Sequence, residues 1–209
     1  KTFIDATGDG DLAALCHVGF DKGRPSDGYT QPMSMIFKVG GIDFGKVISY
    51  MRQNPEQFIL HKDYKQLDRY LAISGFFDIV RLAKACGDFN IPRDRILFFQ
   101  GLHPGESFIN TSRPDSLMIL EAFINTSRII KLSGLSSHDQ TIAETEAARQ
   151  VEELLTFFRK YLPGFESSYL AAIADVTGVR ESRRIHGRYT LTVEDVYEER
   201  TSSEGVAVC

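Results

Sequence analysis

A run of small and acidic residues near the start of the chain is the first segment whose residue types could do chemistry. It covers residues 5–11, and its centre is formed by Ala6, Thr7, Gly8, Asp9 and Gly10. Small residues let a ligand approach the backbone closely, and free N–H groups ahead of a helix attract anions. The run therefore suits a phosphate group or a ribityl chain. An ordinary turn between a strand and a helix would explain the same residues, whereas the carboxylate spacing does not match an EF-hand calcium loop.

A second group of chemically active residues lies between two glycines, at residues 178–187. These positions hold three arginines and one histidine, namely Arg180, Arg183, Arg184 and His186. Arginines placed in this way could hold a carboxylate or an electron-rich ring through paired hydrogen bonds. The alternative is a solvated strand edge on which Glu181 neutralises one of the charges.

Other catalytic chemistries find little support in the sequence. The five histidines are scattered without an i, i+4 pair, so we expect no metal site. No GxSxG motif is present, and no cysteine and histidine stand out as a nucleophilic pair. The three cysteines are widely spaced and form no CxxC pair, which favours reduced thiols in a cytoplasmic protein.

Composition narrows the possible partners. The net charge of −4 comes from 24 basic and 28 acidic residues that are interspersed along the chain. Without a block of lysine or arginine to neutralise phosphates, nucleic acid is not expected as a partner. No apolar run approaches the roughly 20 residues needed to span a bilayer, so we expect no membrane partner either.

The elements that must position these residues can be read from apolar spacing and turn residues. We expect a strand at 3–5, a helix from residue 12 and a loop at 19–31. Further helices are predicted at 44–53, 75–85 and 141–161, and further strands at 33–39, 95–100, 106–111 and 123–131. Glycines 40 and 41 should end the strand at 33–39. Short linkers indicate that the later strands are antiparallel.

The helix at 141–161 has the strongest periodicity, and we expect one of its faces to cover a sheet. Its apolar positions are Ala147, Val151, Leu154, Phe158 and Leu162. Thr141 and Glu144 fit a capping box at its start.

The hexapeptide Phe-Ile-Asn-Thr-Ser-Arg occurs twice, at residues 108–113 and 123–128. Two copies are too few for a solenoid. A local duplication that adds one loop or strand is the better explanation.

Residues 3–14, Phe-Ile-Asp-Ala-Thr-Gly-Asp-Gly-Asp-Leu-Ala-Ala, resemble the second FAD-contacting motif of the FAD-dependent oxidoreductases, two-dinucleotide-binding flavoproteins related to fumarate reductase flavoproteins and thiazole synthases. Later segments resemble the same family in the same order. They are a Met-rich strand at 33–39, the Asn-Thr-Ser-Arg segment, the helix ending at 161–166, the segment Gly-Val-Arg-Glu-Ser-Arg-Arg-Ile at 178–185 and the segment Tyr-Thr-Leu-Thr-Val-Glu-Asp-Val at 189–196.

The resemblance implies an α/β fold with α+β character. Residues 1–30 and 176–209 would form part of a Rossmann-like FAD-binding domain. Residues 31–175 would form an inserted substrate domain, with a mixed or antiparallel sheet and covering helices. The family's N-terminal GxGxxG segment is not in this sequence. We therefore expect this chain to be an internal piece of a longer polypeptide. Its partner would be the missing N-terminal Rossmann segment of that polypeptide.

The resemblance also implies the site and the reaction. Ala6, Thr7, Gly8, Asp9 and Gly10 would lie along FAD, Arg183 would help to bind it, and Arg180 would be the catalytic residue near the flavin ring or the substrate. The complete protein would transfer a hydride or electron pair between a small organic substrate and bound flavin, and this chain alone would be inactive. The alternatives are a non-redox nucleotide-binding or assembly module and a fragment of a nicotinamide-dependent dehydrogenase.

Overall fold

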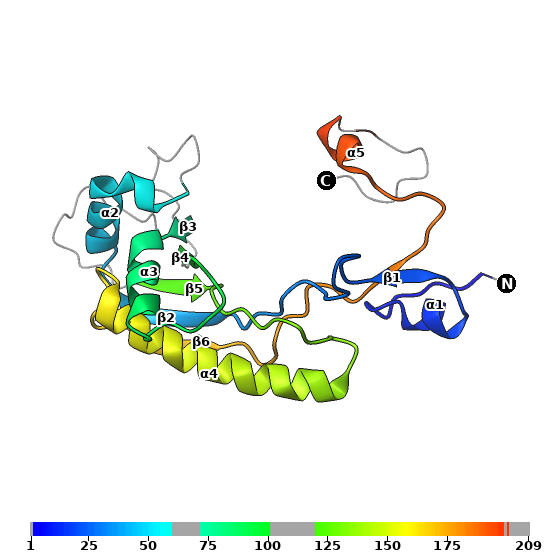
Figure 1. The fold of residues 1–209 in the computed structure, drawn as a ribbon, viewed down its shortest axis with the longest axis horizontal. Coiled ribbons are helices and arrows are strands. Elements are labelled where there is room, and N and C mark those ends of the chain that lie inside the picture. The colour runs from blue at the N-terminus through cyan, green and yellow to red at the C-terminus, as the bar shows by residue number, and fades with distance from the viewer. Residues whose placement is uncertain (1, 60–71, 101–119, 199, 201–209) are drawn as a thin grey trace. The chain divides into compact units, whose positions relative to one another are not determined.

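The chain forms two compact units. The computed structural model describes residues 2–59, 72–100, 120–198 and 200. One unit combines residues 1–28 with residues 182–209, and the other consists of residues 29–181. The two ends of the sequence therefore belong to one unit, and the middle belongs to the other (Figure 1).

The larger unit is built around a five-stranded sheet. Its strand order is β3 (Ala72–Gly75), β4 (Ile96–Gln100), β5 (Leu120–Ile124), β2 (Phe37–Ile42) and β6 (Tyr169–Ile173). Every neighbouring pair is antiparallel, and for β4 and β5 this confirms the prediction from the short linkers. The protein therefore has a mixed α/β fold with antiparallel sheets.

Strand β2 lies inside the sheet and continues through its two glycines, so the prediction that they end it was wrong. A Cβ on Gly40 would lie 2.6 Å from the Cζ atom of Tyr169 on β6, and Gly41 has a φ of 74°. The register of β2 against β5 shifts between Val39 and Ile42. Glycines are needed here because a ring packs onto the backbone and the strand bulges.

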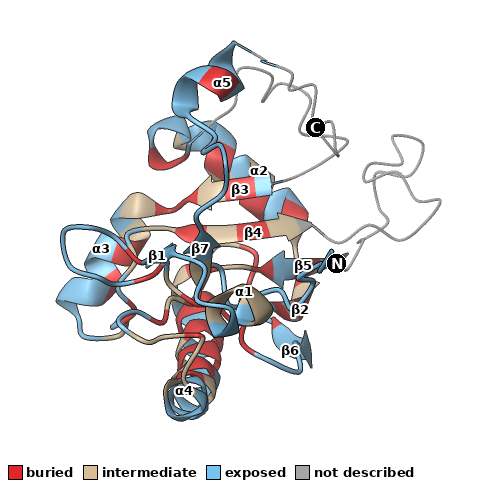
Figure 2. Ribbon diagram, turned by 90° about the vertical axis from the view of Figure 1, so that its right-hand side faces the viewer, coloured by how far each residue is buried: buried red, intermediate tan, exposed pale blue. Residues whose placement is uncertain are grey.

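In the residues described for the larger unit, three α-helices accompany the sheet, together with the short 3-10 helix Pro55–Gln57. They are α2 (Phe44–Gln53), α3 (Phe77–Ala85) and α4 (Ser137–Tyr161). One face of helix α4 is buried and includes Ala147, Val151, Leu154 and Phe158. Figure 2 shows these buried parts of α4 in red. The ring of Phe158 stacks on Phe37 of β2 with a centroid distance of 6.4 Å. The amphipathic helix therefore covers the sheet, as its spacing predicted.

The start of α4 differs from the prediction. Ser136 is the N-cap, and its side chain accepts a hydrogen bond from the Asp139 amide. Thr141 and Glu144 lie inside the helix, where the Glu144 carboxylate accepts a hydrogen bond from the Thr177 amide instead. The predicted capping box was wrong because an earlier serine satisfies the first free amides.

Strand β5 ends at Ile124, before the polar residues of the second hexapeptide copy. The buried Thr126 hydroxyl accepts a hydrogen bond from the Leu97 amide at 2.8 Å and donates one to the Leu97 carbonyl at 2.9 Å. The Ser127 hydroxyl does the same for Met35, at 2.8 and 2.9 Å. Side chains therefore replace backbone pairing here, which explains why the predicted strand at 123–131 stops early. The first copy and the strand predicted at 106–111 lie outside the described residues.

The smaller unit contains short elements only, in the residues that the structure describes. Helix α1 covers Asp11–Leu15, α5 covers Val193–Tyr197, and β1 (Phe20–Lys22) pairs with β7 (Arg183–Ile185) in an antiparallel ribbon. Residues 3–5 form no strand, because no described segment offers them a backbone partner. The strand predicted there was wrong.

Replacing Thr126 with Val should lower the free energy of unfolding by about 1–3 kcal/mol, because the Leu97 amide would lose its acceptor in a part-buried position, whereas the Leu97 carbonyl keeps the Asn125 amide as a donor. Urea unfolding followed by circular dichroism measures the change. Thr145→Val is the matched control, since its exposed hydroxyl only donates to the Thr141 carbonyl within α4. An equal effect of both substitutions would contradict the assigned role of Thr126.

Candidate functional site

The loop before α1 is held in shape by the carboxylate of Asp5. One oxygen of Asp5 accepts hydrogen bonds from the amide and the hydroxyl of Thr7, at 3.0 and 2.7 Å. The other oxygen accepts a hydrogen bond from the Ala13 amide at 2.8 Å. The Thr7 hydroxyl in turn accepts a hydrogen bond from the Asp11 amide at 2.8 Å. The loop is thus closed by its own side chains onto the first turn of α1.

These hydrogen bonds stabilise the charged form of Asp5. The Thr7 hydroxyl, followed by the amides of Ala13 and Thr7, holds the pKa of the Asp5 carboxyl below its ordinary value of 3.8. Asp5 therefore keeps its negative charge at neutral pH. This charge also lies at the N-terminus of α1, where it complements the helix dipole.

The middle of the loop leaves backbone donors available. Within the described residues, the amides of Gly8, Asp9 and Gly10 donate no hydrogen bond to the protein. Gly8 and Gly10 both have left-handed backbones, with φ of 84° and 66°. A Cβ on Gly8 would meet nothing within 4 Å, whereas one on Gly10 would lie 2.7 Å from Ile185 Cδ1. The loop therefore offers unpaired amides on an open side, as a ligand-binding loop requires.

Arg183 supports this loop from β7. One guanidinium nitrogen donates to the Asp9 carbonyl at 2.9 Å and contacts the Asp11 carboxylate at 2.5 Å. The Arg183 side chain is only 18% exposed, and its guanidinium lies over the Phe20 ring at 5.5 Å. The predicted residues 6–10 and Arg183 are thus brought together within the smaller unit.

Arg180 belongs to the larger unit. Its guanidinium donates hydrogen bonds to the Ser34 hydroxyl at 2.9 Å and to the Asn125 side-chain oxygen at 3.0 Å. Ser34 and Gly178 exchange two backbone hydrogen bonds, which place Arg180 beside the end of β5. The division between the units therefore falls between the two predicted arginines, and Arg180 shares its unit with the predicted substrate region.

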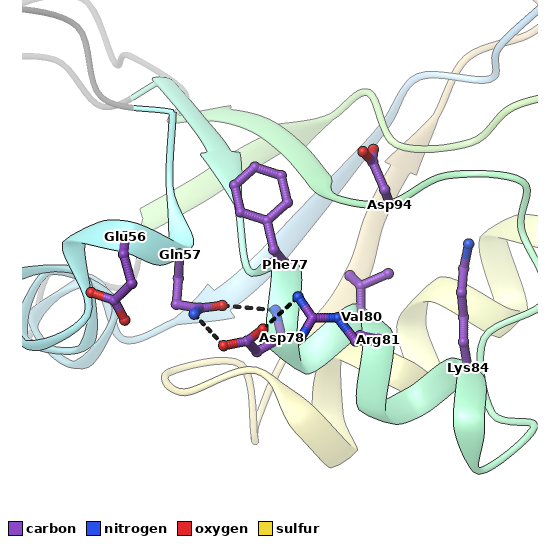
Figure 3. A pocket seen from close by; sticks show the side chains of 8 residues that line it. All are labelled: Glu56, Gln57, Phe77, Asp78, Val80, Arg81, Lys84 and Asp94. Atoms are coloured by element: carbon purple, nitrogen blue, oxygen red, sulfur yellow. Dashed lines mark hydrogen bonds and ion pairs between the residues drawn. The ribbon is translucent and has the colours of Figure 1, made fainter.

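A pocket with a volume of about 400 Å³ lies beside α3 in the larger unit (Figure 3). Its wall includes Gln57, Phe77, Asp78 and Arg81. The Asp78 carboxylate is bound by Arg81 at 2.8 Å and by the Gln57 side chain. Because Gln57, Asp78 and Arg81 bind one another, these three side chains leave few free donors or acceptors on their part of the wall.

Three further observations concern metal ligands, thiols and membrane-spanning helices. The described segments contain no group of three or more His, Cys, Asp or Glu side chains placed to hold a metal ion. Cys16 and Cys86 are exposed free thiols. In the same segments, no helix is both long enough and apolar enough to cross a lipid bilayer.

Sequence reasoning missed the residues that position the site. Asp5 was visible at the edge of the small-residue run, and the spacing Asp-x-Thr is typical of a side chain that binds the backbone two residues later. Ser34 and Asn125 are far from Arg180 in sequence, so only the repeated hexapeptide drew attention to Asn125. No sequence signal pointed to Ser34.

Comparison with known proteins identifies the family. The sequence model of the FAD dependent oxidoreductase family matches residues 1–209, which is the whole chain. The chain therefore belongs to the FAD dependent oxidoreductase family, and its cofactor is FAD. No curated protein matches the chain significantly. No solved structure matches it significantly either.

Replacing Asp5 with Asn should loosen the loop before α1, because one of the two acceptor oxygens becomes an NH2 group, which cannot accept the hydrogen bonds of Thr7 or of the Ala13 amide. Hydrogen exchange at the amides of Thr7 and Ala13 should become faster. Asp9→Asn is the control in the same loop, since no hydrogen bond of the Asp9 side chain to the described residues is present. Unchanged exchange in the Asp5 variant would show that its carboxylate does not hold the loop.

Acid should loosen the same loop. A carboxyl group with a lowered pKa in the folded protein stabilises the fold above its unfolded pKa, and this contribution is lost as the pH falls through the folded pKa. For Asp5 the loss begins below its ordinary value of 3.8. The carbon NMR shift of the Asp5 carboxyl measures its titration. A midpoint at or above 3.8 would contradict the hydrogen-bonding pattern of the loop.

Proposed function

We propose that the complete protein transfers a hydride or an electron pair between a small organic substrate and bound FAD. Family membership supports the redox class and the cofactor. The proposal that FAD binds to this chain rests mainly on the loop before α1, where three unpaired amides lie on an open, glycine-containing turn. The substrate would be bound through the larger unit.

The loop residues fit part of a FAD site. Ala6, Thr7, Gly8, Asp9 and Gly10 would lie along the cofactor, because unpaired amides ahead of a helix can bind phosphate or ribose oxygens. Gly8 leaves the open space that such an approach needs. FAD, when bound, supplies the chemistry of hydride or electron-pair transfer, and the protein supplies binding, orientation and charge.

One unit would bind the cofactor and the other would bind the substrate. Residues 1–30 and 176–209 would form part of a Rossmann-like FAD-binding domain, and residues 31–175 would form the substrate domain inserted into it. The two observed units have similar bounds, with the divisions after residue 28 and before residue 182. The union of both end segments in one unit supports this arrangement. The GxGxxG motif is absent from the 209 residues, and we propose that another segment of the same polypeptide supplies it.

The two arginines would have different tasks. Arg183 would act on FAD through the loop, since it holds the Asp9 carbonyl and the Asp11 carboxylate. Arg180 would position the substrate or stabilise negative charge near the flavin ring. Its anchoring by Ser34 and Asn125 supports a fixed orientation, because those two hydrogen bonds restrict the guanidinium.

A non-redox nucleotide-binding module is the second candidate, because the same unpaired amides could bind any phosphate group. The two functions differ in their optical spectra. A flavoenzyme absorbs visible light and loses that absorbance when it is reduced, whereas a nucleotide-binding module is colourless.

The visible spectrum of the complete protein should show a flavin band that survives desalting.

Replacing Gly8 with Ala should weaken FAD binding at least tenfold. The added methyl group would occupy the open side of the loop. Gly28→Ala is a matched control. Gly28 also has a left-handed backbone, with a φ of 73°, and a methyl group added there would meet nothing within 4 Å, so both variants bear the same backbone strain.

Two outcomes would count against the proposal. A protein that is colourless after incubation with FAD and desalting would leave the nucleotide-binding module as the better explanation. Equal loss of flavin in the Gly8 and Gly28 variants would show that backbone strain, and not contact with FAD, causes the effect.

A further inference from the structure

Three arginines of the larger unit lie around the end of β5. They are Arg93, Arg128 and Arg180. In the described part of the chain, none of their guanidinium groups forms an ion pair with Asp or Glu. Arginine side chains are charged at all physiological pH values, so their charges repel one another when no anion is present.

Asn125 links two of these arginines. Its backbone carbonyl accepts a hydrogen bond from Arg93 Nη1 at 3.0 Å. Its side-chain oxygen accepts one from Arg180 Nη2, also at 3.0 Å. Two positively charged groups from distant parts of the sequence are thus attached to a single residue. Arg128 follows Asn125 by three positions, and its backbone is held by the Gln150 side chain of α4.

Arg93 has an unsatisfied donor. Its Nε atom is buried and has no hydrogen-bond partner. Burial lowers the pKa of the Arg93 guanidinium, and the charges of Arg128, Arg180 and Arg95 lower that pKa further, while Asp94 opposes them. A buried donor on a charged group is costly unless a partner is supplied, and an anion would supply it.

Three acidic residues close to these arginines in sequence or on neighbouring elements are bound by other groups. The Asp94 carboxylate is bound by Arg95, with Arg95 Nε at 2.9 Å from Asp94 Oδ1. Glu146 of α4 is bound by Arg149 and by Gln150. The Glu181 carboxylate, next to Arg180 in sequence, accepts a hydrogen bond from the Gln31 amide. The excess of positive charge at the end of β5 is therefore not balanced by these groups.

We propose that Arg93, Arg128 and Arg180 form a binding site for an oxyanion group of the substrate, a carboxylate or a phosphate. The planar guanidinium fork matches both groups, because each presents two oxygens to paired N–H donors. The inference rests on the proposed function for the identity of the ligand as substrate. Binding of the anion itself is independent of flavin chemistry.

The site assigns a task to each arginine. Arg180 and Arg93 have orientations fixed by Asn125, so they would define the position of the oxyanion. The Arg128 guanidinium donates no hydrogen bond to the described residues, so it is available to the ligand. Loss of Arg128 should therefore weaken anion binding without removing a contact that holds the fold.

Isothermal titration calorimetry of the complete protein with succinate, and separately with inorganic phosphate, tests the site. We expect Arg128→Gln and Arg180→Gln to raise the dissociation constant at least tenfold for whichever anion binds. Arg95→Gln is the matched control, because it removes the same charge from the same region while its side chain binds Asp94. Arg93→Lys keeps the charge but loses the fork, and it should give an intermediate constant.

The outcomes separate the ligand sources and the two proposals. Binding of succinate alone identifies a carboxylate, and binding of phosphate alone identifies a phosphate group. No heat with either anion, or equal weakening by Arg95→Gln and Arg128→Gln, overturns the site. The flavin band is read on the same samples. A protein that binds the anion but retains no flavin contradicts the proposed function and leaves the anion site standing.

Discussion

The larger unit depends on a few hydroxyl groups that take over where backbone pairing stops. Buried amides and carbonyls must find partners, and beyond Ile124 the strand β5 no longer supplies them. Thr126 and Ser127 satisfy both backbone groups of Leu97 and Met35, so two consecutive residues join the chain after β5 to β4 and to the segment before β2. Because each hydroxyl both donates and accepts, the segment after β5 is held on two sides.

The segment after β5, held in this way, gives the neighbouring charges their positions. Asn125 precedes the two hydroxyl residues and holds Arg93 and Arg180, while Gln150 of α4 binds the backbone of Arg128. The same segment therefore stabilises the sheet and orders the positive groups beside it. In the smaller unit Asp5 has a comparable task, since it closes the loop on which the unpaired amides of residues 8–10 lie.

Sequence reasoning worked where a local pattern determines the structure. The apolar spacing of α2 and α4 predicted both helices, because one face of each must be buried. It failed where pairing depends on distant residues. Strand β6 was missed because its five residues are all exposed and show no alternation, and residues 3–5 were assigned to a strand that has no described partner. The contacts of Arg180 could not be predicted either, since Ser34 and Asn125 are remote in sequence.

Family membership establishes FAD as the cofactor, and we assign part of its binding to the loop before α1. The most direct test is a proton–nitrogen correlation NMR spectrum of the complete protein, recorded with and without FAD. The protein is labelled with nitrogen-15 in its glycines only. We expect the amide signals of Gly8 and Gly10 to move on FAD binding, while that of Gly28 stays in place. Unchanged signals of Gly8 and Gly10 in a protein that has bound FAD would contradict the assignment of this loop to the cofactor.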